Sequence, residues 1–444
     1  MRRSLCLLIA AIAGVLIASR AEAVDIREVT TPRGIKAWLV QDKSAPLVAL
    51  SFSFPGGTAS EPESQKGVTS LMARMLTDGA GTLPAQDFRL RQEEAAVSLD
   101  FGASPDRLNG SLRVLSANRD QAFDLLRLAL TAPRFDADML EQRRSQAIAS
   151  FNQAEQRPRA VAERTMMRTM FAGHPYGRDG QDFRETLKTI ASSDLRQRAA
   201  SLLRRDGLIV AAVGDIDADG LAQALDHAFG DLPAGEPAST SSQWAIPQWT
   251  PSDKPRNVIV ERPVPQSAIV MAMPGVLRAD PDWYAALVLS HILGGGQQSR
   301  LFNEVRDKRG LAYSVSSSLR PAAKASLLVI STGSANDRVA ETIPVIRREI
   351  ARLREHGVDE QELADAKTYL TGALALSLDS SRAVAGLLHG LRVDGLPRDF
   401  LDRRAGLIAA VTRADVDRVA RRLLRDDATV TVVVGKPQGL VLER

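Results

Sequence analysis

The residues whose chemistry stands out first lie between Ser299 and Tyr313, in the stretch SRLFNEVRDKRGLAY. This stretch places Arg306 and Tyr313 seven residues apart, with Gly310 between them. Arginine presents a permanently charged, planar fork of donors that fits carbonyl and carboxylate oxygens, and tyrosine presents a neutral O–H donor. An arginine and a tyrosine at this spacing are common, so their meaning depends on the residues around them.

The elements that must position this pair are a helix, a turn at Gly310 and a strand. The helix follows the run Gly294–Gly296, which invites comparison with a phosphate-binding loop. That run lacks the Gly-Lys-Ser/Thr ending and follows a helix rather than a strand, so we interpret it as a flexible helix exit near a binding cleft.

The whole stretch 291–319, HILGGGQQSRLFNEVRDKRGLAYSVSSSL, resembles the C-terminal half of the pitrilysin/insulinase-type zinc peptidases. The resemblance extends from about Val24 to the end of the chain, and it is to the short, two-domain bacterial form. It implies that Arg306 and Tyr313 are catalytic residues that face a zinc ion across an interface between halves. Tyrosine would donate to the oxyanion of the scissile carbonyl, and arginine would hold substrate oxygens.

The N-terminal half of that family carries an inverted zinc motif, His-x-x-Glu-His, on a helix, and a third ligand on a later helix. The matching helix is QKGVTSLMARMLTDGAG (65–81), and the later one is MLEQRRSQAIASFNQAEQRP (139–158). The four motif positions are degraded to residues that cannot hold zinc: Ser70, Ala73, Arg74 and Ser150. Arg74 would repel a dication. We therefore assign no metal to this chain.

Histidines elsewhere do not suggest a replacement site. None of the five has another within three to five residues: His174, His227, His291, His356 and His389. His174 lies in the turn-like AGHPYGRDG, where a loop or packing role is expected. A weaker hypothesis than those given below is an active peptidase with an unconventional metal site. Stoichiometric zinc in the purified protein would support it.

An internal repeat predicts the architecture. When the halves are aligned so that Asp194 lies over Asp415, the segment 192–215 matches a segment within 412–436 without a gap. Both read as an amphipathic helix followed by a β-branched strand. We predict two homologous α+β domains, each a mainly antiparallel sheet with helices packed on one face, together half of a peptidase clamshell. The expected boundaries are 24–235 and 256–444, joined by the Pro- and Ser-rich linker 236–255.

Residues 1–23 predict a secretory signal peptide, with Arg2 and Arg3 before an apolar run and Ala21–Ala23 at the cleavage site. We expect export to the periplasm, with no membrane attachment after cleavage. The only cysteine, Cys6, lies in this segment. Cleavage removes three arginines and one glutamate, so the net charge falls from +4 to +2. This net charge is small, and the arginines are interleaved with acidic residues along the sequence. The sequence therefore gives no support for nucleic-acid binding.

Short members of the family generally work as pairs that enclose unfolded peptides. The resemblance therefore implies the non-metal subunit of a heterodimeric zinc endopeptidase, catalytically incomplete alone. The expected partner is an HxxEH-bearing homologue that holds the zinc. The alternative is a peptide-binding or scaffold protein that acts alone or as a homodimer. In either case the family implies that the strand region 100–114 pairs with extended peptides at a sheet edge.

Overall fold

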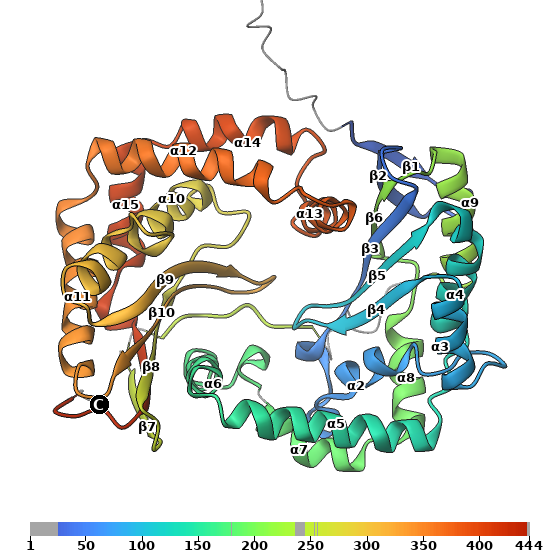
Figure 1. Ribbon diagram of the computed structural model, residues 1–444, viewed down its shortest axis with the longest axis horizontal. Helices are drawn as coiled ribbons and strands as arrows, with labels where there is room; N and C mark the ends of the chain where they lie inside the picture. Colours follow the sequence, from blue (N-terminus) through green and yellow to red (C-terminus); the bar gives the residue numbers. More distant parts are fainter. Residues whose placement is uncertain (1–24, 179, 236–244, 253, 255, 442–444) are drawn as a thin grey trace, which may run out of the picture.

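The computed structural model describes residues 25–178, 180–235, 245–252, 254 and 256–441, and two β-sheets organise them (Figure 1). The strands of the first sheet, in spatial order, are β1 (Arg27–Thr30), β2 (Lys36–Gln41), β6 (Ile209–Gly214), β3 (Leu47–Pro55), β5 (Arg107–Leu115) and β4 (Ser98–Ala103). Those of the second are β7 (Arg256–Glu261), β11 (Val430–Gly435), β8 (Gln266–Pro274), β10 (Ser326–Ala335) and β9 (Ala312–Pro321).

Helices follow both sheets. Those of the first half are α2 (Val68–Met75), α3 (Ala85–Glu94), α4 (Arg119–Thr131), α5 (Ala137–Glu155), α6 (Pro158–Met170), α7 (Gly180–Thr189), α8 (Ser192–Leu202) and α9 (Ala218–Phe229). Those of the second half are α10 (Trp283–Gly294), the π-helix η6 (Phe302–Asp307), α11 (Val339–His356), α12 (Glu360–Leu376), α13 (Ser381–Val393), α14 (Phe400–Ala409) and α15 (Arg413–Leu423). Short 3₁₀ turns are η1 (Thr58–Ser60), η2 (Glu63–Gln65), η3 (Ser116–Asn118), η4 (Pro175–Gly177) and η7 (Asp426–Ala428).

The repeat predicted from the sequence is present in space. The same alignment, Asp194 over Asp415, carries the bounds of α8 onto those of α15, and the bounds of β6 onto those of β11. Each of these strands lies between one parallel and one antiparallel neighbour: β6 between β2 and β3, and β11 between β7 and β8. All other pairings are antiparallel among the described strands. Two homologous α+β domains with mainly antiparallel sheets are therefore confirmed.

The helices of each half cover one face of their own sheet, as predicted, and a helix from the other half covers the opposite face. Helix α6 of the first half packs its residues Val161, Ala162 and Met166 on the second sheet. Helix α13 of the second half packs Ala385 and Leu388 on the first sheet (Figure 1). The physical reason is visible in the central strands, which are apolar on both sides: every residue of β11, VTVVVG, is buried. A strand apolar on both sides needs cover on both faces.

The tips of two hairpins also join the halves. Asp106, between β4 and β5, accepts the hydroxyl of Tyr176 (2.5 Å) and the backbone N–H of Ala323 (3.0 Å), between β9 and β10. The described part of the predicted linker, 245–252, packs nearby, with Trp249 4.8 Å from the ring of Phe171. Residues 236–244, 253 and 255 of that linker, and the predicted signal peptide 1–23, lie outside the described residues.

Candidate functional site

Arg306 and Tyr313 are brought together by a π-helix and a tight turn. In η6 the backbone N–H of Lys308 donates to the carbonyl of Asn303 (2.9 Å), the five-residue spacing of a π-helix. Gly310 then adopts a φ of +60°, a left-handed conformation that glycine takes without a Cβ clash. Its N–H donates to the Arg306 carbonyl (2.8 Å), so the helix ends there and β9 begins two residues later. Short π-helical segments occur often at functional sites.

A β-bulge aims Tyr313 away from the sheet. Among the described strands, β9 is an edge strand that pairs with β10 alone. Between Thr332 and Ser334 the register shifts, so Tyr313 and Ser314 together oppose Gly333. The hydroxyl of Thr332 donates to the Ser314 carbonyl (2.7 Å) and holds the extra residue in place. Bulges reorient side chains in this way, and the Tyr313 side chain is 84% exposed.

Arg306 lies beside Tyr313, stacked between two rings. Its guanidinium carbon is 4.6 Å from the centre of the Phe302 ring and 5.3 Å from that of Tyr313. None of the described carboxylates forms an ion pair with Arg306, and the nearby Glu304 pairs with Lys308 and Arg309 instead. The hydrogen bond from Lys308, followed by that from Arg309, holds the pKa of Glu304 below its usual range, against the effect of burial. Arg306 therefore keeps its donors for a ligand while its orientation is restricted.

Three of the four positions predicted to be a degraded zinc motif, Ser70, Ala73 and Arg74, lie on α2. Buried Glu61 fixes the start of this helix by accepting the backbone N–H groups of Gly67 and Thr69, each at 2.7 Å. Burial raises the pKa of the Glu61 carboxyl, although these two hydrogen bonds favour its charged form. On the helix, Ser70 is half-buried, Ala73 is buried and Arg74 is exposed.

The motif residues do not fit zinc. Ser150, on α5, is exposed, and its hydroxyl donates to the Gln146 carbonyl (2.8 Å). Two hydroxyls, a methyl group and a guanidinium include none of the imidazole, thiolate or carboxylate ligands that zinc requires. Within the described part of the chain there is also no group of three or more His, Cys, Asp or Glu residues that could hold a metal ion.

The histidines have other partners. His174 uses both ring nitrogens: Nδ1 accepts the N–H of Tyr176 (3.1 Å), so Nε2 donates to the Pro247 carbonyl (2.9 Å). This is the packing role expected from the sequence. His291 stacks on Tyr369 with ring centres 4.5 Å apart, and burial lowers its pKa. His389 binds Ser53 across the two halves.

The predicted zinc-motif positions and the Arg306–Tyr313 pair lie on different halves of the chain. Helix α2 packs against α5, α8 and β4 in the first half, whereas η6 and β9 pack against α10, α11 and β10 in the second. Ser70, Ala73 and Arg74 therefore belong to one half, and the Arg306–Tyr313 pair belongs to the other (Figure 1).

Sequence reasoning missed Phe302 and the bulge. Phe302 precedes Arg306 by four residues, a spacing at which helical side chains are neighbours, so that contact could have been found. The bulge depends on a register between strands that no local pattern in 312–335 reveals.

Both halves of the chain match models of one protein family. Residues 36–180 match the model of insulinase, peptidase family M16, and residues 189–370 match that of the peptidase M16 inactive domain. The chain belongs to the insulinase, or M16, peptidase family.

Two proteins of similar length and one longer protein illustrate the range of proteins that this chain resembles. The chain is 25% identical to the Helicobacter pylori protein named non-peptidase homolog YmxG, over 97% of this chain and 98% of that protein. It is 25% identical to a solved peptidase M16 inactive domain from Pseudomonas fluorescens, with a TM-score of 0.85 over 95% of this chain and 99% of that one. It also superposes on 46% of the periplasmic protease PqqL from Escherichia coli, over 94% of this chain, with a TM-score of 0.78 and 18% identity. The fold is that of half an M16 clamshell.

None of the helices among the described residues has the length and apolar character needed to span a bilayer.

Proposed function

We propose that this protein is the non-metal subunit of a periplasmic heterodimeric zinc endopeptidase. The observation that carries the proposal is the contrast between its two halves. The second half holds Arg306 and Tyr313 side by side and open to solvent, on a π-helix and a bulge. The first half presents Ser70, Ala73 and Arg74 where the family has its zinc ligands. The similarity over 97% of the chain to a protein named non-peptidase homolog supports the absence of an independent peptidase site.

In this proposal the Arg306–Tyr313 pair acts on a peptide bound between two subunits. The Tyr313 hydroxyl donates to the oxygen that becomes negative as the scissile carbonyl is attacked, so its effect is largest in the transition state. Arg306 holds a carbonyl or carboxylate oxygen of the peptide through its fork of N–H groups. Because β9 is a sheet edge, an extended substrate can lie beside the residue that acts on it.

The partner would be an HxxEH-bearing homologue that supplies the zinc and the attacking water. Its complementary half-clamshell would enclose an unfolded peptide against this chain. The signal-like residues 1–23 support the assignment of both subunits to the periplasm.

Reconstitution with such a partner tests the proposal. The chain alone should not hydrolyse peptides, and addition of the HxxEH-bearing homologue should produce activity. In the mixed complex Tyr313→Phe removes only the hydroxyl, and kcat should fall roughly 100-fold with little change in KM, the loss typical of one oxyanion donor.

Tyr369→Phe is the matched control, because Tyr369 is also exposed, at 56%, but lies on α12 outside the pair. Its complex should turn over at the unchanged rate. Equal rates for the Tyr313→Phe complex and the unsubstituted complex would rule out the assigned role.

A second candidate is a catalytically inert peptide-binding protein that acts alone or as a homodimer. The edge strand β4 favours it, because β4 pairs with β5 alone among the described strands and its outer backbone groups can bind an extended peptide without any chemistry. Calorimetric titration with unstructured peptides separates the two functions. Tight binding by the chain alone, with no hydrolysis after the partner is added, would support this second candidate over the first.

A further inference from the structure

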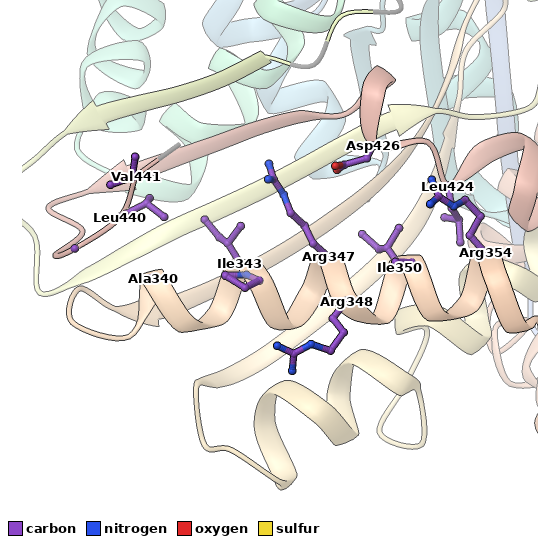
Figure 2. A pocket seen from close by; sticks show the side chains of 13 residues that line it. Ala340, Ile343, Arg347, Arg348, Ile350, Arg354, Leu424, Asp426, Leu440 and Val441 are labelled. Carbon is purple, nitrogen blue, oxygen red and sulfur yellow. The ribbon is translucent and has the colours of Figure 1, made fainter. Parts of the chain in front are cut away.

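Helix α11 and the last described residues of the chain line a cavity of about 590 Å³, which shares no lining residue with α2 or with the Arg306–Tyr313 pair. Figure 2 shows one row of α11 side chains facing it: Ala340, Ile343, Arg347, Ile350 and Arg354. From Ala340 to Arg354 this row extends about 21 Å, at a rise of about 1.5 Å per residue. The cavity is therefore long enough for an extended ligand, and its volume is typical of small-molecule sites.

Apolar side chains make up one end and the walls. Ile343 and Leu440 face each other across the end nearest the C-terminus of the described chain, and Val441 beside them is 90% exposed. Ile350 and Leu424 continue the apolar wall toward the opposite end. A ligand with a hydrocarbon portion would cover this surface.

Positive charge occupies the middle and the other end. The described residues that line the cavity include three arginines and a single carboxylate: Arg347, Arg348, Arg354 and Asp426. Past Arg354 the surface continues into a second hollow lined by Arg421, Arg425, Asp426 and Asp427, in which Arg425 pairs with Asp427 (2.7 Å). The excess of cations favours a negatively charged group there.

Arg347 is only partly satisfied by the protein. Its Nη2 donates to the side chains of Asn257 (3.1 Å) and Thr431 (3.4 Å). Its Nε is buried without a hydrogen-bond partner among the described residues, and none of the described carboxylates forms an ion pair with it. A buried donor without a partner is costly, so a ligand that lowers this cost by bringing an anion close to the guanidinium is favoured.

From these features we propose that the cavity binds a single-chain amphiphile with an anionic head group, of which a free long-chain carboxylate is the simplest. The head group lies among Arg347 and Arg354, and the hydrocarbon chain lies along Ile343 toward Leu440. A neutral apolar ligand would leave the arginine donors without an acceptor. A cationic amphiphile of the same length would be repelled by them.

Calorimetric titration of the full mature chain with sodium dodecanoate, kept below its micelle concentration, tests the proposal. One equivalent should bind, and dodecyltrimethylammonium should not. Affinity should rise by up to about fourfold for each methylene between octanoate and dodecanoate, the gain expected when a methylene is fully buried.

Two substitutions locate the site without touching the hydrogen bonds of Arg347. Arg354→Gln removes one head-group cation and should weaken binding roughly tenfold. Ala340→Glu places a charge at the apolar end, in the first turn of α11 where helices tolerate acidic residues, and should abolish binding. Arg403→Gln, on exposed α14, is the matched control and should bind like the unsubstituted chain.

Equal binding by all three variants, or equal binding of the cationic amphiphile, would overturn the proposal, as would the absence of any binding to the folded protein. Binding only to vesicles of phosphatidylglycerol, with none to monomeric dodecanoate, would also overturn it, because the surface would then recognise a membrane rather than a single chain.

Discussion

The contact between Ser53 and His389 joins the two halves of the chain, and it predicts that acid lowers the free energy of unfolding. Ser53, on β3, is fully buried, and its Oγ lies 2.7 Å from Nε2 of His389 on α13. The same Oγ accepts a hydrogen bond from Nε of Arg107 (2.6 Å). Because arginine can only donate, the serine hydrogen is available to donate to the imidazole. The lowered pKa of His389 keeps its imidazole neutral near pH 7, so Nε2 can accept this hydrogen.

Protonation of His389 would replace this acceptor with a donor in a cationic environment. Burial lowers the pKa of His389 from 6.5 to about 4, and the charges of Arg107 and Arg392 add to the effect. At about 1.36 kcal/mol for each pKa unit, this difference corresponds to roughly 3 kcal/mol. The unfolded chain binds the proton first, so this stability is present above pH 6.5 and is lost as the pH falls toward 4.

The measurement is the free energy of unfolding in urea at several pH values, followed by tryptophan fluorescence. His389→Gln removes the titrating group, so the stability advantage of the unsubstituted protein over this variant should shrink by roughly 3 kcal/mol between pH 7 and pH 4. His356→Gln, at the exposed end of α11, controls for loss of a histidine and should change stability equally at both pH values. A constant difference between His389→Gln and the unsubstituted protein would refute the reasoning.

Three further predictions follow from other contacts. Arg306→Lys keeps the charge but loses the planar fork and the ring stacking, so kcat/KM of the reconstituted complex should fall at least tenfold; an unchanged value would remove Arg306 from the substrate site. Ala191 precedes α8 at the position where the second repeat has Thr412, whose hydroxyl accepts the N–H of Asp415 at the start of α15. Ala191→Thr should therefore raise the free energy of unfolding, measured in urea, by about 1 kcal/mol. No gain in stability would contradict the equivalence of the two helix caps. Arg198 lies buried near Glu61 at the start of α2, where its guanidinium donates to the Gly57 carbonyl and to the hydroxyls of Ser60 and Thr69 (2.9 Å each). Arg198→Met should cost roughly 3 kcal/mol in the same assay, because it leaves these acceptors without their donor and Glu61 without a nearby cation; a cost below about 1 kcal/mol would show that the start of α2 does not depend on Arg198.

Much of the architecture could be read from the residues. Sliding one half of the chain over the other identified the repeat, because helix caps, apolar spacing and β-branched runs are local features that survive duplication. The Arg306–Tyr313 pair was found through the sequence around it, and the structure places the Arg306 guanidinium carbon 5.3 Å from the centre of the Tyr313 ring. Only residue types were needed to see that Ser70, Ala73 and Arg74 do not fit zinc, because no fold can turn a methyl group into a metal ligand.

Other features were decided by contacts between distant segments. The hydrophobic run of β11 shows that both its faces are buried, yet nothing local in VTVVVG says that α6 from the other half covers one of them. Likewise the exposure of Tyr313 depends on how β9 is registered against β10, and the charge state of His389 depends on Arg107, which belongs to the other half of the chain. Periodicity reveals which side of an element is buried, but the identity of its neighbour is set by long-range packing, and hydrogen bonds and pKa values follow from that neighbour.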